Sequence, residues 1–172
     1  SSILFENTYA SDQPAIFDGN TNLKVEKLLV GRDENNSWLN TDKFKFKLDI
    51  DKSDETTVNA LNNGDISLPN NHNEIEITGN DLIKEASFGD ISFNKVGIYK
   101  FIVTEISDDK LQGIEYSSEV KNIEVVISDN LDGSLTAVKG INSDTLFFQN
   151  IYSIDNYILE GSANLKVTKE LA

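Results

Sequence analysis

Hydrophobic and polar residues alternate along most of this chain. Alternating runs rich in β-branched and aromatic residues predict strands near residues 23–30, 43–50, 56–61, 74–78, 97–106, 114–116, 120–128, 134–139 and 145–152. The segments between them are rich in Asn, Asp, Gly and Ser, which favour turns. Many short strands joined by such turns are typical of an antiparallel β-sandwich, so we predict an all-β fold. The one helical feature that we expect is a single turn at 80–85, capped by Asn80.

Three of the predicted strands carry one polar residue each on an otherwise apolar face. Successive side chains of a strand point to opposite sides of the sheet, so every second residue shares a face. The aligned sets are Leu23, Val25, Lys27 and Leu29; Tyr99, Phe101, Val103 and Glu105; and Leu146, Phe148, Asn150 and Tyr152. A buried charge is costly unless it is paired or neutralised, so these positions mark a candidate site.

A lysine and an asparagine can form an intramolecular isopeptide bond, and a nearby glutamate can promote the reaction. Burial lowers the pKa of a lysine, which would expose a nucleophilic amine at Lys27. Burial favours the protonated acid at Glu105, which we expect to donate a hydrogen bond to the Asn150 carbonyl and a proton to departing ammonia. The product is a neutral Lys27–Asn150 amide between the first and last strands. Because this reaction occurs once, within one chain, we do not expect an enzyme that turns over a substrate.

Each of the three residues also has an ordinary structural explanation. Lys27 could lie at a strand edge with its stem on apolar surface, and Glu105 could form a simple salt bridge with it. Asn150 could be a turn residue. Their joint occurrence on apolar faces favours the cross-link over these separate explanations.

Two motifs of the interior recur at the ends of the chain. Residues 21–28 resemble 163–170, and residues 5–9 resemble 148–152. The offsets, 142 and 143 residues, are nearly one period, which is typical of a tandem array.

This period divides the chain into three parts. We expect the last strand of a preceding repeat and a linker in 1–19, a complete repeat in 20–153, and a linker with the first strand of the next repeat in 154–172. Asn7 and Lys169 would then be cross-link residues of the neighbouring repeats. Alternatively, the terminal strands of separate molecules could pair and cross-link.

The composition narrows the possible partners and cofactors. The net charge is −14, from 15 basic and 29 acidic residues, so nucleic acid and anionic membranes are unfavourable partners. The chain has no Cys, which excludes disulfides and thiolate metal sites, and its single His72 has no nearby His or Cys in sequence. We therefore expect no metal or cofactor. Met is also absent, even at the first position, and no signal peptide is visible, so we expect a fragment or a processed product.

Four motifs give the chain a resemblance to a known family. They are Leu23-Lys24-Val25-Glu26-Lys27, the run from Gly97 to Glu105, Gly113-Ile114-Glu115-Tyr116, and Phe148-Gln149-Asn150-Ile151-Tyr152. In this order, over residues 20–153, the sequence resembles the Gram-positive pilin isopeptide-linkage domain of streptococcal major pilins. The resemblance implies an Ig-like, CnaB-like β-sandwich with Lys27 as nucleophile, Asn150 as electrophile and Glu105 as catalytic acid.

We therefore expect a structural module in the stalk or shaft of a bacterial adhesin or pilus. It would lie outside the cell, anchored to the cell wall, with adjacent repeats of the same polypeptide as its partners. No Leu-Pro-x-Thr-Gly sorting signal or clear pilin-polymerising lysine motif is present, which favours an adhesin repeat over a pilus subunit. One alternative is a binding module for a host protein or glycan. Trp38 could mark its surface, but we favour a half-buried hydrophobic residue under a loop at this position. Another alternative is a carboxylate-based glycosidase.

Overall fold

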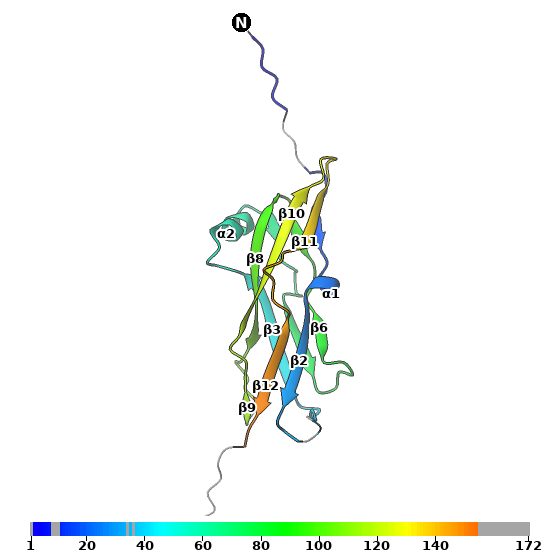
Figure 1. Ribbon diagram of the computed structural model, residues 1–172, viewed down its shortest axis with the longest axis vertical. Helices are drawn as coiled ribbons and strands as arrows, with labels where there is room; N and C mark the ends of the chain where they lie inside the picture. Colours follow the sequence, from blue (N-terminus) through cyan, green and yellow to red (C-terminus); the bar gives the residue numbers. More distant parts are fainter. Residues whose placement is uncertain (1, 8–10, 34, 36, 155–172) are drawn as a thin grey trace, which may run out of the picture.

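The structure, a computed structural model, describes residues 2–7, 11–33, 35 and 37–154. The strands form an elongated β-sandwich (Figure 1). The predicted all-β, Ig-like sandwich is confirmed, and its strand pairs are antiparallel with the exception of one parallel pair. Within the described part of the chain, no helix is long and apolar enough to cross a membrane.

The strands of the described residues form three sheets. The five-stranded sheet has the order β11 (Leu135–Lys139), β10 (Val120–Asp129), β8 (Gly97–Ile106), β3 (Lys43–Ile50) and β5 (Glu74–Thr78). The four-stranded sheet has the order β6 (Glu85–Ser87), β2 (Lys24–Val30), β12 (Phe147–Tyr152) and β9 (Ile114–Glu115). The small sheet has the order β1 (Ala15–Phe17), β7 (Ile91–Phe93) and β4 (Ile66–Ser67).

The two smaller sheets both pack against the inner face of the five-stranded sheet. Phe148 of β12 lies against Phe46 of β3, with ring centroids 5.0 Å apart. In the other half of the sandwich, Phe93 of β7 stacks on Tyr99 of β8 at 5.4 Å. All four side chains are buried, and burying such large apolar surfaces is the main favourable contribution to the fold.

The parallel pair joins β2 to β12, the first and last strands of the four-stranded sheet along the chain. Its register places Lys27 opposite Phe148 and Leu29 opposite Asn150. Parallel neighbours need a long connection, and here that connection is the rest of the sandwich from β3 to β11. The fold therefore brings together two strands that are far apart in sequence.

The strand predicted at 56–61 is wrong, because this segment lies in helix α2 (Glu55–Asn62). Asp54 caps the helix by accepting a hydrogen bond from the Thr57 N–H at 3.1 Å. Thr57 and Ala60, one turn apart, are buried against the sandwich. The β-branched residues of this segment favour a strand locally, but capping and the buried helical face outweigh that preference.

The helical turn predicted at 80–85 is also wrong. The Asp81 carboxylate accepts a 2.7 Å hydrogen bond from the Thr78 N–H, which forms a turn, and Glu85 begins β6. The short helix α1 (Gly19–Asn22) and strands β1, β4, β6 and β7 were not predicted. Each has two to four residues, too few to show a period in the sequence. Of these, β1 precedes residue 20, and its Ala15 and Phe17 are buried in the core.

Candidate functional site

The three polar residues singled out in the sequence lie inside the sandwich, on two facing sheets. Lys27 and Asn150 lie on the neighbouring strands β2 and β12, and Glu105 lies on β8 of the five-stranded sheet. Each takes an inward position in a row of core residues. Counted over the whole residue, backbone included, the exposed fractions are 3% for Lys27, 9% for Glu105 and 0% for Asn150. The strand alternation thus carries all three into the core.

A single carboxylate oxygen connects the three side chains. Glu105 Oε1 accepts hydrogen bonds from Lys27 Nζ at 2.9 Å and from Asn150 Nδ2 at 2.8 Å. This differs from the expectation that Glu105 contacts the Asn150 carbonyl, since the carboxylate lies on the nitrogen side of the carboxamide. Glu105 Oε1 therefore contacts both the nitrogen that would attack Asn150 Cγ, which is Lys27 Nζ, and the nitrogen that would leave it, which is Asn150 Nδ2.

A fourth group, the peptide N–H of Ser117, completes the site. It donates to Asn150 Oδ1 at 2.8 Å and to Glu105 Oε2 at 3.2 Å. Ser117 follows β9 and the Gly113–Tyr116 motif. This contact cannot be predicted from the sequence, because every residue except proline carries a peptide N–H.

The surroundings of Lys27 are apolar. Its Nζ lies 4.8 Å from the ring centroid of Phe44 and 5.6 Å from that of Phe46. Burial lowers the pKa of Lys27 from 10.5 to about 8, and the Coulomb attraction and hydrogen bond from Glu105 oppose this shift only in part. A larger fraction of neutral amine is consequently available than at an exposed lysine.

All buried side-chain polar atoms of the described region have partners. No side-chain nitrogen or oxygen buried there lacks a hydrogen bond. Among the same residues, no group of three or more His, Cys, Asp or Glu side chains is arranged to hold a metal ion. The groups that meet at the site are an amine, a carboxyl, a carboxamide and one peptide N–H.

The structure describes one of the two residues that were assigned to neighbouring repeats. Asn7 belongs to the described segment 2–7, which is exposed and has no regular secondary structure. Lys169 lies outside the described residues, as does the repeated motif at 163–170.

Trp38 packs against the core, as the favoured interpretation of this residue predicts. Its ring meets Phe44 edge-on at 5.2 Å, and Lys84 Nζ lies 4.8 Å from its centroid. Trp38 is only partly buried, but its position is explained by covering Phe44.

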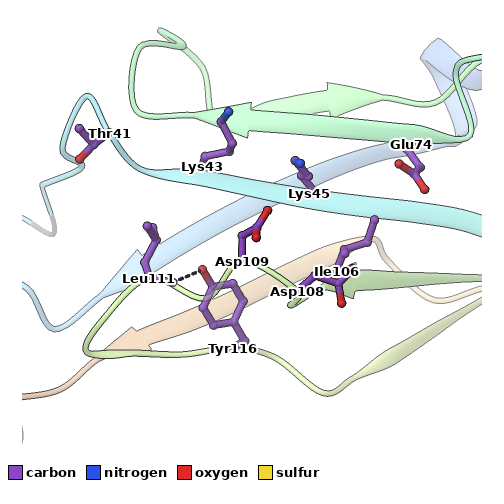
Figure 2. Close-up of a pocket in the computed structure, with 9 residues that line it drawn as sticks. All are labelled: Thr41, Lys43, Lys45, Glu74, Ile106, Asp108, Asp109, Leu111 and Tyr116. Carbon is purple, nitrogen blue, oxygen red and sulfur yellow. Dashed lines mark hydrogen bonds between the residues drawn. The ribbon is translucent and has the colours of Figure 1, made fainter.

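A cavity of ≈ 390 Å³ lies between β3 and the loop that joins β8 to β9 (Figure 2). Side chains of both charges line it, including Lys43, Lys45 and Asp109. None of Lys27, Glu105 and Asn150 contributes to its wall. Tyr116 lies at this cavity, and its hydroxyl accepts a 2.9 Å hydrogen bond from the Leu111 N–H.

Comparison with solved structures finds pilins of low sequence identity. The major pilin of Streptococcus pyogenes is 16% identical with a TM-score of 0.47, and the match covers 85% of this chain and 51% of the pilin. The S. pyogenes major pilin protein T-13 is 18% identical with a TM-score of 0.44, and the match covers 81% of this chain and 55% of T-13. The chain therefore spans about half the length of the pilins that it matches.

Comparison with curated protein sequences finds no match. Comparison with protein families does: the FctA family, described as the Spy0128-like isopeptide-containing domain, matches residues 23–153. The matched range begins at β2 and ends just beyond β12, so it contains all four groups of the site. On this match the chain belongs to the FctA family of isopeptide-containing domains.

Proposed function

We propose that this domain is a self-cross-linking structural module of a Gram-positive pilus or surface adhesin. Lys27 and Asn150 are joined by an isopeptide bond, and Glu105 promotes its formation. The observation that carries this proposal is the position of Glu105 Oε1, which contacts both Lys27 Nζ and Asn150 Nδ2 in the core. Family membership supports the same assignment.

The reaction begins with a proton transfer inside the ion pair. Lys27 Nζ gives one proton to Glu105, which produces an amine and a carboxylic acid. The lowered pKa of Lys27 reduces the cost of this step. Proximity supplies much of the rate, because aligned intramolecular partners reach effective concentrations of about 10⁵ M or more.

The amine then adds to Asn150 Cγ and forms the new C–N bond. Glu105 gives its proton to Nδ2 and receives one from Nζ, so the acid is regenerated. Cleavage of the Cγ–Nδ2 bond releases ammonia. One amide forms, one amide breaks, and the buried ammonium is replaced by a neutral amide that no longer needs a counter-charge.

The location of the bond suits a load-bearing role. Near the start of the domain, the Asp12 N–H donates to Gly133 O in the β10–β11 hairpin at 3.2 Å. The chain leaves after β12, at the opposite end of the long axis (Figure 1). Tension along this axis would pass through β2 and β12 as shear. A covalent bond between these strands would carry it past the 122 residues from 28 to 149.

The repeated motifs extend the proposal to an array of domains. Residues 20–153, with the preceding strand β1 packed on the same core, form one cross-linked repeat, and Asn7 and Lys169 supply cross-link residues to the repeats before and after it. The partners are then adjacent repeats or pilin subunits on the outside of a cell-wall-anchored fibre. The sequence period supports this organisation. The alternative adhesin role for this domain rests on the sequence alone.

Intact mass under denaturing conditions tests the cross-link. Formation of the bond removes one ammonia, so the purified chain should weigh about 17 Da less than its sequence. Glu105→Ala should restore the full mass, whereas Glu115→Ala, an exposed glutamate on β9, should retain the deficit. Asn7→Ala should also retain it. A wild-type chain with its full sequence mass would refute the cross-link.

A further inference from the structure

We propose that the peptide N–H of Ser117 is the oxyanion donor for this reaction. This inference rests on the proposed cross-link and assigns a function to a backbone group that the Lys27, Glu105 and Asn150 roles leave unused. The N–H contacts Asn150 Oδ1, which is the atom that gains negative charge when the amine adds to Cγ.

The carboxamide of Asn150 is held by different groups on its two sides. Its nitrogen donates to Glu105 Oε1 at 2.8 Å, and its oxygen accepts from the Ser117 N–H at 2.8 Å. Proton transfer to the leaving group and stabilisation of the oxygen are thus separated in space. Glu105 serves the nitrogen side and Ser117 the oxygen side.

The electron movements place charge next to this donor. When the Lys27 lone pair adds to Cγ, the electrons of the C=O π bond move to Oδ1. When the intermediate collapses, they re-form the carbonyl and Nδ2 departs as ammonia. A hydrogen-bond donor already 2.8 Å from Oδ1 stabilises this oxyanion without having to reorient. The effect is strong because Asn150 is fully buried and little water screens the charge.

The same N–H also contacts Glu105, but more weakly. Its distance to Glu105 Oε2 is 3.2 Å, against 2.8 Å to Asn150 Oδ1. Once Glu105 is protonated, its oxygens become poorer acceptors, and the N–H is left to the developing oxyanion. The Ser117 N–H thus donates to both Glu105 Oε2 and Asn150 Oδ1 before the reaction, and mainly to Oδ1 during it.

Tyr116 fixes the position of this donor. Its hydroxyl accepts from the Leu111 N–H at 2.9 Å (Figure 2). Its ring lies 5.7 Å from the ring of Phe44. On the other side, Ser117 Oγ accepts from the Glu119 N–H at 3.2 Å. The segment that presents the Ser117 N–H is therefore held at both ends, as preorganised stabilisation of an oxyanion requires. Tyr116 is a positioning residue.

Replacing the amide at residue 117 by an ester tests the donor. Two full-length chains are compared. The Ser117→Ala chain keeps the N–H at residue 117. The ester chain carries the α-hydroxy acid counterpart of alanine at that position, so an oxygen takes the place of the N–H. Both chains are made by cell-free synthesis and sampled into denaturing acid. The readout is the rate at which the mass falls by about 17 Da.

The ester chain should lose ammonia about 10²–10³-fold more slowly than the Ser117→Ala chain, the usual effect of removing one oxyanion donor. The pH dependence of the two rates should have the same shape, because Lys27 and Glu105 are unchanged. Equal rates would overturn the assignment. A wild-type chain that never loses ammonia would instead refute the cross-link itself, and the oxyanion role with it.

A direct measurement of the hydrogen bond covers the case in which the ester chain does not fold. Lys27→Met cannot cross-link, so the uncleaved carboxamide remains. In this chain, a through-hydrogen-bond scalar coupling should join the Ser117 nitrogen to Asn150 Cγ in the NMR spectrum. Its absence from the folded chain would overturn the assignment.

Discussion

Lys27 and Glu105 form a 2.9 Å ion pair in which neither side chain has any solvent-exposed surface. Removing two charges from water costs several kcal/mol for each ion, and their mutual attraction offsets this only when the geometry is good. The lowered pKa of Lys27 shows that burial dominates over that attraction. Before any bond forms, the pair is thus poised to transfer its proton, and the proposed reaction removes the buried charge.

The first prediction concerns the pH dependence of stability in an Asn150→Ala chain, which cannot cross-link but keeps the Lys27–Glu105 pair. The pKa of Lys27 is about 8 when folded and near 10.5 when unfolded, so the unfolded chain binds more protons between these values. The free energy of unfolding should therefore rise with pH from about 8 to 10, by at most about 1.4 kcal/mol per pH unit.

Below pH 8, Lys27 is protonated in both the folded and the unfolded chain, so it adds nothing to the pH dependence of the free energy of unfolding. Urea unfolding at several pH values measures the effect. Adding Lys27→Met to the Asn150→Ala chain should abolish the Lys27 contribution. Parallel pH curves for the two chains would contradict the lowered pKa.

The second prediction concerns the stability that the covalent bond provides. A bridge from Lys27 to Asn150 closes a loop of 122 intervening residues. By analogy with a disulfide across about 100 residues, it should stabilise the domain by about 4–5 kcal/mol through chain entropy. Lys27→Met and Asn150→Ala should both lose this contribution, as measured by urea unfolding. If either variant is as stable as the wild type, the bond does not constrain the unfolded chain.

The third prediction concerns the buried carboxylate of Asp42, which is 2% exposed. Arg32 binds it through its two terminal guanidinium nitrogens, one of them at 3.1 Å, and the Leu39 N–H donates at 2.7 Å. Arg32→Ala removes one hydrogen-bond donor from each carboxylate oxygen of Asp42 and leaves its buried charge without a counter-charge. The free energy of unfolding should fall by about 3 kcal/mol, as measured by thermal or urea unfolding.

Lys52→Ala is the matched control for this loss. Lys52 also faces an aspartate, Asp49, but its side chain is 79% exposed. Its removal should change stability by less than about 0.5 kcal/mol. Similar effects of the two substitutions would show that the Arg32–Asp42 pair contributes no more than a surface pair.

The fourth prediction compares two adjacent threonines of α2. Thr57 is fully buried, and its hydroxyl accepts a 2.8 Å hydrogen bond from the Lys100 N–H of β8. Thr57→Val keeps the shape but leaves that N–H without its acceptor, which should cost about 1–3 kcal/mol. Thr56→Val, at an exposed position of the same helix, should stay within about 0.5 kcal/mol. Equal losses in urea unfolding would mean that helix propensity alone determines both effects.

Long alternating runs made most of the sandwich predictable. The bounds predicted for β3, β5 and β8 coincide with the observed strands, since each contains enough alternating residues to define its inner face. Local preference failed at α2, where the cap at Asp54 and the contact of Thr57 with β8 determine a helix. It also failed for β1, β4, β6 and β7, which have two or three residues each and exist only because a neighbouring strand pairs with them.

The sequence by itself determined that Lys27, Glu105 and Asn150 lie in the core, because side-chain alternation along a strand is a local property. It could not determine that they meet. That depends on the parallel pairing of β2 with β12 and on β8 facing them from the other sheet. The tertiary structure also decided that Glu105 contacts the nitrogen of the carboxamide and that the Ser117 N–H contacts its oxygen. A backbone donor has no signature in the sequence, so only the folded position of the loop reveals it.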